Sequence, residues 1–571
     1  MNDTAYRFRG TSLHRSLPGL LLLLTVGAYA DERVDLATIH QIKAEAFAGS
    51  KVMDHLFWLT DATGPRLTGS PGLRSAQEWA LRTLSGWGAA NAHLEKWGTF
   101  GRGWAMSRFS LSMVEPVYVP LQAVPKAWSG GTDGTVTADV VLAPLFLPSE
   151  RGDMYDLGKL KAHIRDFSEE QKGQLRGKVV LLEKARELEL PAEVESTRYD
   201  EAKLTALALA PEPTSPAPLE WPVMKLPVDP KKRWEFFSTV PLAAQEDYWA
   251  RRDAAYDALW AFLRAEGAVA AFFTDRRGHG GLVFVESVHG WNPKAALPPP
   301  VIVLAPEPYD RLVRLVEKKV PVKVALDLQV KTYDDNPDGL NVIAEIPGGK
   351  KQDEVVMLGA HLDSWHAATG ATDNAAGSAV VLEAFRILKA LKLPMNRTVR
   401  LALWSGEEQG LMGSIGYVRA HFGDPVSMVL KPEHSKLAAY FNLDSGTGKI
   451  RGVYLQGNDM VRPIFEQWLA PFRDQGASTL SIRNDFGTDH LSFDAVGLPG
   501  FDFIQDPLDY DTRTHHSNLD TYDHLQAGDL MQASAILAAF VYQTAIRQER
   551  LPRKPLPSPM PPKTVSPAET Q

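Results

Sequence analysis

The second half of the chain alternates short apolar runs with stretches of helical spacing. Strand-like apolar runs occupy 340–346, 354–360, 398–404, 437–444, 452–457 and 497–504. The stretches with helical spacing are 374–391, 411–421, 459–471 and 524–546. Buried strands that alternate with helices predict a mainly parallel, mixed sheet sandwiched by helices. The predicted fold class is therefore α/β.

The N-terminal segment carries a different pattern. Residues 31–110 place apolar side chains at roughly helical spacing, which predicts a mainly helical segment. Ser70-Pro71 is a typical helix start, and Gly86 or Gly88 a typical end. We expect 31–110 to be the first part of the larger domain and 336–550 to be its main part.

Between 111 and 335 the pattern becomes β-rich. Apolar runs at 138–146, 177–184, 268–275 and 298–305 are separated by Pro- and charge-rich segments. The stretch 186–245 is the most irregular and predicts an exposed excursion. We therefore predict a smaller domain at 111–335, inserted into the larger one. The Pro-rich segment 551–571 predicts a disordered tail.

The first thirty residues resemble an export signal. Arg7, Arg9 and Arg15 precede the apolar run LPGLLLLLTVGAYA, which ends in the small-x-small pattern Ala28-Tyr29-Ala30. This pattern predicts a signal peptide at 1–30, cleavage before Asp31, and a periplasmic or secreted protein. A retained membrane anchor is the alternative, although the run is short for a bilayer span. No later run predicts a span in the mature chain.

The amino-acid composition limits which partners and which metal ligands the protein can have, but it says little about the fold. The 571 residues are 44% hydrophobic and 23% charged, as in ordinary soluble proteins. A net charge of −8 offers no electrostatic case for a nucleic-acid partner. The chain has no cysteine, so disulfides are excluded and any metal site depends on His, Asp and Glu.

Polar side chains follow several of the predicted strands. In α/β folds, ligands bind at the carboxyl ends of the strands. The residues found there are His361, Asp363, Asp373, Glu407, Glu408, Asp444, His515, His516 and Asp520. Singly, each has an ordinary alternative: an Asp before a helix is often an N-cap, and adjacent glutamates often lie in a solvated turn. Together they form the imidazole and carboxylate set that divalent cations prefer when thiolates are absent.

This ordered set resembles the co-catalytic zinc exopeptidases. That family includes bacterial leucyl aminopeptidases, glutamate carboxypeptidase and the transferrin receptor ectodomain. The stretches HLDSW, LWSGEEQG, DSGT, HHS with the following DT, and the early TGPRLTGSPG are most similar to carboxypeptidase Q (plasma glutamate carboxypeptidase). The resemblance covers most of 50–545 and implies a zinc-exopeptidase fold, a protease-associated-like inserted domain and a homodimer.

The resemblance also implies a role for each matching residue. It implies two Zn²⁺ ions per chain, held by His361, Asp373, Glu408, Asp444 and His516, with Asp373 bridging the two ions. His361 and Asp444 would complete one metal position, and Glu408 with His516 the other. Glu407 would act as the general base. Two cations would make adjacent glutamates tolerable, because opposite charge offsets their repulsion.

Three further residues have more open roles. Asp363 is expected to accept the free N–H of His361, with a solvated loop aspartate as the alternative. Asp520 is expected to brace the loop of His516, with helix capping as the alternative. His515 stands where simple aminopeptidases carry a tyrosine. It is expected to donate a hydrogen bond to the tetrahedral intermediate, unless it is only a loop histidine.

The leading hypothesis is an exported zinc-dependent exopeptidase that hydrolyses short peptides, in the manner of a carboxypeptidase Q-like dipeptidase. The alternative within the family is an aminopeptidase that releases N-terminal residues from longer peptides. A non-catalytic binding ectodomain, like that of the transferrin receptor, would lack metal ligands that are present here. Single-zinc glutaminyl cyclases would lack the full ligand set as well.

Overall fold

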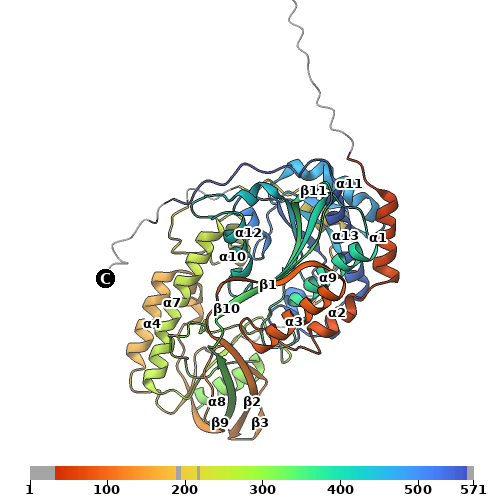
Figure 1. Cartoon of the computed structure of the whole chain (residues 1–571). Coiled ribbons are helices and arrows are strands. Elements are labelled where there is room, and N and C mark those ends of the chain that lie inside the picture. Colours follow the sequence, from red (N-terminus) through yellow and green to blue (C-terminus); the bar gives the residue numbers. More distant parts are fainter. Residues whose placement is uncertain (1–31, 188–194, 215–218, 562, 564–571) are drawn as a thin grey trace, which may run out of the picture. The chain divides into compact units, whose positions relative to one another are not determined.

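The apolar runs of the second half form an eight-stranded mixed sheet in the computed structural model of the chain (Figure 1). The structure describes residues 32–187, 195–214, 219–561 and 563, so the predicted signal peptide at 1–30 lies outside the described residues. The strand order is β1(Ala90–Thr99), β10(Asp338–Ile346), β12(Arg397–Trp404), β11(Lys351–His361), β13(Leu437–Asn442), β16(Gly500–Gln505), β14(Ile450–Tyr454) and β15(Thr479–Ser481). The four central strands, β12, β11, β13 and β16, run parallel.

Helices cover both faces of this sheet, which confirms the predicted α/β class. One face packs against α1(Leu36–Ala48), α2(Val52–Leu59), α3(Pro71–Gly86), α9(Ala376–Ala390), α11(Arg462–Leu469) and α13(Ala527–Ile546). The other face packs against α10(Met412–His421) and α12(His490–Asp494). Along β11 the side chains alternate between the two cores: Val356 and Leu358 face α9 and α13, whereas Val355 and Met357 face the opposite side.

The start of the chain is helical only as far as Gly86. Helix α3 begins as predicted, because the Ser70 side chain accepts a hydrogen bond from Leu73 N and Pro71 opens the first turn. Beyond it, β1 and β2(Gly103–Glu115) replace the helical structure expected up to 110. The expectation was wrong there because β1 is a half-exposed edge strand whose burial does not alternate cleanly.

A second eight-stranded sheet is built mostly from the segment between β1 and β10. Its order is β3(Val119–Pro120), β2, β9(Lys323–Tyr333), β5(Val136–Leu142), β6(Val179–Leu181), β7(Ala270–Thr274), β8(Val301–Leu304) and β4(Ala123–Pro125). The predicted apolar runs contain β6, β7 and β8 in full and most of β5, which begins two residues before its run. Residues from Val34 on pack as one compact unit, so the domain limits at 111 and 335 remain a prediction.

This second part holds more helix than the sequence pattern indicated. Its helices are α4(Leu157–Glu170), α5(Glu201–Ala208), α6(Pro230–Phe237), α7(Leu242–Glu266) and α8(Pro306–Glu317). Helices α4 and α7 lie side by side at the lower left of Figure 1. The irregular stretch 186–245 thus contains α5, α6 and the start of α7. Helix α7 escaped prediction because its apolar residues are spread around the helix rather than along one stripe.

Short turns complete the fold, and some of them carry polar residues of interest. They are the 3₁₀ turns Pro148–Tyr155, Pro432–Lys436, Asp459–Val461, Ala470–Gln475 and Tyr522–His524, and the π turns Ala371–Ala375 and Tyr510–Thr514. Among the described residues, no helix combines the length and apolar character needed to cross a bilayer.

The described part of the C-terminal segment packs on the protein instead of lying free. Leu551 is buried, Arg553 donates a hydrogen bond to the carbonyl oxygen of His434 (3.1 Å), and Met560 N donates to Val426 O (3.0 Å). The expectation of a disordered tail from 551 on does not fit these contacts. Hydrogen bonds to distant loops, which composition does not reveal, hold the described part of this segment against the protein.

Candidate metal centre

The carboxyl edge of the first sheet collects the residues expected there. His361 is the last residue of β11, Glu407 and Glu408 follow β12, and Asp444 follows β13. These three strands are adjacent and parallel, so their ends meet at one edge. Asp373 reaches the same place from the Ala371–Ala375 turn before α9, and His515 and His516 reach it from the loop after Tyr510–Thr514.

One group of contacts surrounds His361. Its Nε2 lies 3.2 Å from Asp373 Oδ1 and 3.2 Å from Asp444 Oδ1. Glu407 stands slightly further away, with Oε2 at 3.9 Å from the same nitrogen. These side chains are all almost completely buried. One imidazole nitrogen therefore faces three carboxylates.

A second group surrounds His516 and shares Asp373 with the first. His516 Nε2 lies 3.0 Å from Glu408 Oε2 and 3.3 Å from Asp373 Oδ2. The two oxygens of Asp373 thus face two different histidines. The neighbouring glutamates also separate, since Glu407 lies beside His361 and Glu408 beside His516. The structure brings together all five expected ligands and the expected base.

The donor set fits a divalent cation. Nitrogen and oxygen atoms of His361, Asp373 and Glu408 all lie within 4.8 Å of one another, as do those of Asp373, His515 and His516. Asp373 Oδ2 and Glu408 Oε1 are buried and accept no hydrogen bond. Buried carboxylate oxygens without a partner are costly, and a bound cation would satisfy them. Histidine and carboxylate ligands suit zinc.

The electrostatics of the centre also favour added positive charge. Burial, together with the charge of Asp373, raises the pKa of Glu408 to about 8. Burial and the nearby Asp444 raise the pKa of Glu407 well above its usual value. Burial alone would lower the pKa of His361, but the charges of Asp444 and Glu407 outweigh it and raise that pKa. Glu407 and Glu408 are thus difficult to keep ionised without a cation.

The orientation of His361 is set by the chain beside it. Its Nδ1 lies 3.0 Å from the backbone oxygen of Asp363, which leaves Nε2 facing the carboxylates. The Asp363 carboxylate is 3.7 Å from Nδ1 and does not make the expected hydrogen bond. It accepts instead from Thr68 Oγ1 (2.9 Å) and from Glu407 N (3.4 Å). Asp363 therefore positions the loop of Glu407 rather than the imidazole.

Asp520 supports a different loop from the one expected. Its carboxylate accepts from Thr372 N at 2.6 Å and from Asp373 N at 3.2 Å. It therefore holds the turn of Asp373, not the loop of His516, and it caps no helix. Its backbone oxygen also accepts from Thr369 N (3.1 Å).

His515 lies at the border of the ligand cluster. Its Nε2 is 3.8 Å from Asp373 Oδ2, and its ring stacks on Tyr510 with centroids 4.7 Å apart. The side chain is 33% exposed, against 1% for His361. It is thus the cluster's most accessible histidine.

Several supporting residues were missed by sequence reasoning. Arg66 is fully buried and donates to the carbonyl oxygens of Leu59, Leu362, Thr369 and Gly370, which ties the loops of His361 and Asp373 together. Thr68 accepts from Gly406 N while it donates to Asp363. Both lie in the TGPRLTGSPG stretch, so the family motif was the signal that could have found them. Glu286, which contacts His516 Nδ1 at 2.9 Å, belongs to no quoted motif.

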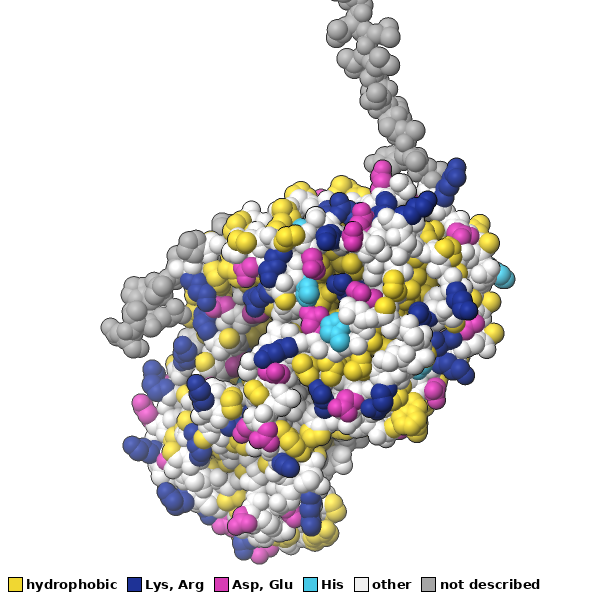
Figure 2. All heavy atoms as spheres, in the orientation of Figure 1, with side chains coloured by type: hydrophobic (Ala, Val, Ile, Leu, Met, Phe, Trp, Pro, Cys, Tyr) yellow, Lys and Arg dark blue, Asp and Glu magenta, His cyan; other side chains and the backbone are white. Residues whose placement is uncertain are grey.

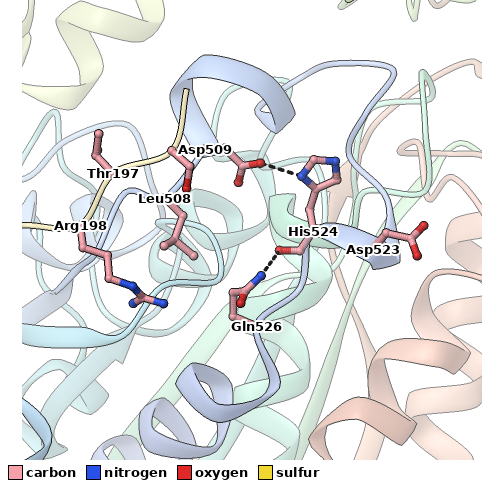
Figure 3. Close-up of a pocket in the computed structure, with 8 residues that line it drawn as sticks. Thr197, Arg198, Leu508, Asp509, Asp523, His524 and Gln526 are labelled. Atoms are coloured by element: carbon pink, nitrogen blue, oxygen red, sulfur yellow. Dashed lines mark hydrogen bonds and ion pairs between the residues drawn. The ribbon is translucent and has the colours of Figure 1, made fainter. Parts of the chain in front are cut away.

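A separate pocket of about 380 Å³ lies beside the start of the histidine loop (Figure 3). Its lining is polar and includes Arg198, Asp509, Asp523, His524 and Gln526. Within it, His524 Nδ1 lies 2.7 Å from Asp509 Oδ2. None of the predicted site residues lines this pocket.

Over the face of the molecule seen in Figure 2, cationic and anionic side chains are interspersed.

The segment that carries this cluster is similar in sequence to a known family of peptidases. Residues 341–541 match the model of peptidase family M28. The segment 341–541 is therefore similar to the peptidase domains of family M28. This confirms the resemblance to co-catalytic zinc exopeptidases, and the domain is of a metallopeptidase type.

The relatives of the M28 domain span both expected activities. Carboxypeptidase Q of Rattus norvegicus is 32% identical over 255 residues, which cover 44% of this chain and 51% of that protein. The chain therefore spans about half the length of the curated relatives it matches. Among solved structures, a peptidase M28 precursor from Shewanella amazonensis has a TM-score of 0.61 at 22% identity, covering 91% of this chain and 98% of that one.

A zinc aminopeptidase from Bacillus subtilis shares the same fold. Its TM-score is 0.51 at 18% identity, and the match covers 87% of this chain and 95% of that one. Both structural matches extend well beyond 341–541. The fold similarity therefore includes residues outside the M28 segment.

Proposed function

We propose that this protein is an exported zinc-dependent metallo-exopeptidase that hydrolyses short peptides, in the manner of a carboxypeptidase Q-like dipeptidase. The observation that carries the proposal is the shared carboxylate: Asp373 turns one oxygen toward His361 and the other toward His516. Such an arrangement suits two cations held side by side. The similarity to carboxypeptidase Q supports the choice of substrate class.

Two Zn²⁺ ions would be held by the side chains already described. His361 and Asp444 would hold one, Glu408 and His516 the other, and Asp373 would serve both. Bound zinc supplies positive charge that polarises a substrate carbonyl and lowers the pKa of water to about 7. The rest of the mechanism depends on this chain's own side chains.

Glu407 would move the proton. Its Oε2 lies 3.9 Å from His361 Nε2, further away than the Asp373 and Asp444 oxygens at 3.2 Å, and its side chain is 8% exposed. Oε2 would accept a proton from the attacking water and pass it to the leaving amine. Asp363 keeps this side chain in place through the backbone N–H of Glu407. Burial excludes bulk water, which strengthens the electrostatic interactions.

His515 would contact the substrate and is not one of the five proposed metal ligands. It is the more exposed histidine, and the stacked Tyr510 ring restrains it. An imidazole N–H at this place would donate a hydrogen bond to the tetrahedral oxyanion. The alternative is that His515 is only a loop histidine and does not contact the substrate.

The same proposal includes export and a homodimer. Export is supported by the pattern at 1–30 and the dimer by the family resemblance. N-terminal sequencing of the protein from the producing cell is expected to begin at Asp31, and sedimentation is expected to give twice the mass of the mature chain. A chain that retains residue 1 in the membrane fraction, or that sediments as a monomer, would contradict these two parts.

An aminopeptidase is the second candidate, favoured by the fold shared with the zinc aminopeptidase from Bacillus subtilis. A substrate panel separates the two activities. The zinc-loaded protein is given one dipeptide with both termini free, its N-acetylated form, its C-amidated form and an N-free tetrapeptide. We expect cleavage of the doubly free dipeptide alone. Cleavage of the amide and the tetrapeptide as well would establish the aminopeptidase, and no cleavage by a protein with two bound zinc ions would overturn the substrate class.

A further inference from the structure

The loop that carries His516 pairs with the connection between β7 and β8 of the second sheet. The segment 281–286, which follows β7, runs antiparallel to 516–518 with Phe284 opposite Ser517. Val285 N donates to His516 O at 2.9 Å, and Asn518 N donates to Val283 O at 3.0 Å. We call 281–286 the docking segment.

Side chains reinforce this backbone pairing. The Asn518 side chain accepts from Val283 N at 2.7 Å and donates to Gly281 O at 3.3 Å. Trp365 packs its ring edge-on against His516, with centroids 5.9 Å apart. The imidazole is thus bounded by an aromatic ring and by the docking segment.

The docking segment also supplies a carboxylate to the imidazole. Glu286 Oε1 lies 2.9 Å from His516 Nδ1, on the ring nitrogen opposite the one that faces Glu408 and Asp373. A carboxylate that accepts a hydrogen bond from the Nδ1–H group favours the tautomer in which Nε2 is unprotonated and free to bind a cation, and it makes Nε2 more basic. At His361 the corresponding nitrogen, Nδ1, meets the backbone oxygen of Asp363 at 3.0 Å, whereas the nearest carboxylate oxygen, that of Asp363, stands 3.7 Å away. The two histidines are therefore supported unequally.

We infer that Glu286 is a positioning residue for metal binding, which acts through His516 and tightens the metal position formed by His516 and Glu408. This inference rests on the proposed two-zinc function. It makes the connection between β7 and β8 a contributor to the metal centre, although this connection lies outside the M28 segment at 341–541. The inference applies to one metal position only, because the position formed by His361 and Asp444 does not depend on Glu286.

The chain offers a matched control. On the surface, His421 Nδ1 lies 3.2 Å from Glu433 Oε2, and the two glutamates have similar side-chain exposures, 49% for Glu433 and 45% for Glu286. Glu433→Ala therefore removes a comparable histidine–carboxylate contact away from the cluster. Glu286→Gln keeps an oxygen that can accept from Nδ1 but removes the charge.

The experiment measures zinc bound per chain by the full-length protein and its variants against a series of buffered free-zinc concentrations. Circular dichroism of the zinc-free proteins checks that each variant folds. For Glu286→Ala we expect one zinc to bind about 10–100-fold more weakly while the other keeps its affinity. Glu286→Gln should recover part of the loss, and Glu433→Ala should match the wild type.

Each outcome decides a separate point. If the wild type binds two zinc ions and Glu286→Ala binds both as tightly, the inference is wrong while the proposed function stands. Equal weakening of both positions would also overturn it, because the effect would then be general. A wild type that binds no zinc would overturn the proposed function and this inference together.

Discussion

Asp520 is the side chain that holds the shared carboxylate in place. It accepts hydrogen bonds from Thr372 N and Asp373 N, so Asp520→Ala would leave two buried N–H groups without acceptors. We expect the free energy of unfolding of the zinc-free protein to fall by about 1–3 kcal/mol. Zinc affinity should fall at both positions, because Asp373 serves both. Denaturant unfolding and zinc titration measure the two effects.

The control for this change lies three residues away. Asp523 is exposed and takes no part in the turn of Asp373. Asp523→Ala should leave both unfolding and zinc binding within error of the wild type. If Asp520→Ala behaved in the same way, Asp520 would not support the centre.

Sequence reasoning found the side chains of the site but not all of their partners. His361, Asp373, Glu408, Asp444 and His516 could be collected because each follows a recognisable strand or precedes a helix. The partner of Asp363 was wrong, since the backbone oxygen and not the carboxylate meets His361. Such details depend on loop conformation. The contact of Glu286 with His516 joins residues 230 positions apart, and no local pattern indicates it.

Helices α2 and α9 are joined by a buried ion pair that should make stability depend on pH. Glu383 accepts from His55 Nε2 (3.2 Å), Arg386 Nε (2.8 Å) and Lys51 N (3.0 Å). Burial alone would raise the pKa of Glu383, but the hydrogen bonds from His55 and Arg386 outweigh it and lower that pKa to about 2. A lowered carboxyl pKa adds stability that is fully present above about pH 4.5 and is lost as the pH falls toward 2.

Glu383→Gln tests this link. The fall in pKa to about 2 corresponds to about 3 kcal/mol, which the zinc-free variant should lose from its free energy of unfolding at pH 7. The deficit should shrink as the pH is lowered from 4.5 toward 2. Urea unfolding of zinc-free proteins across this range measures it. Glu78→Gln, on the exposed pair with Arg74, should change stability little at any pH; a deficit that stays constant with pH would contradict the assignment.

Strands and helices were predictable where burial leaves a strong pattern. The parallel strands β11, β12 and β13 are buried on both faces and read as apolar runs, as expected for the centre of such a sheet. The short β15 and α12 escaped prediction because three and five residues carry no period. Helix α7 escaped because its apolar residues are spread around the helix. Helices α4 and α8 do carry an apolar stripe, so their pattern could have predicted them.

Removal of metal should loosen the whole protein. Without cations, the carboxyl groups of Asp373, Glu407, Glu408 and Asp444 remain crowded at one buried edge, where burial raises the pKa of Glu407 and Glu408 and no cation stabilises their ionised form. We expect a chelator to lower the midpoint of thermal unfolding and zinc to restore it. Zinc at about 100 times its dissociation constant would add about 2.7 kcal/mol. Calorimetry with and without chelator measures the change, and an unchanged midpoint would argue against a native metal centre.

The division of the chain into two sheets was predictable from the change in composition near 111 and 335, but their connection was not. The backbone of the docking segment pairs with that of 516–518. The sequence pattern assigns these two segments to different domains, so it gives no sign that they meet. The carboxyl edge of one sheet is thereby completed by a loop from the other.

The most direct measurement is dipeptide hydrolysis by Glu407→Gln, with the zinc content of the same sample determined. We expect two zinc ions per chain, as in the wild type, and a kcat lower by about 10²–10⁴-fold, because the amide cannot accept the proton. Retained zinc together with the lost rate would establish Glu407 as the base. A variant with two zinc ions and wild-type kcat would contradict the proposed mechanism.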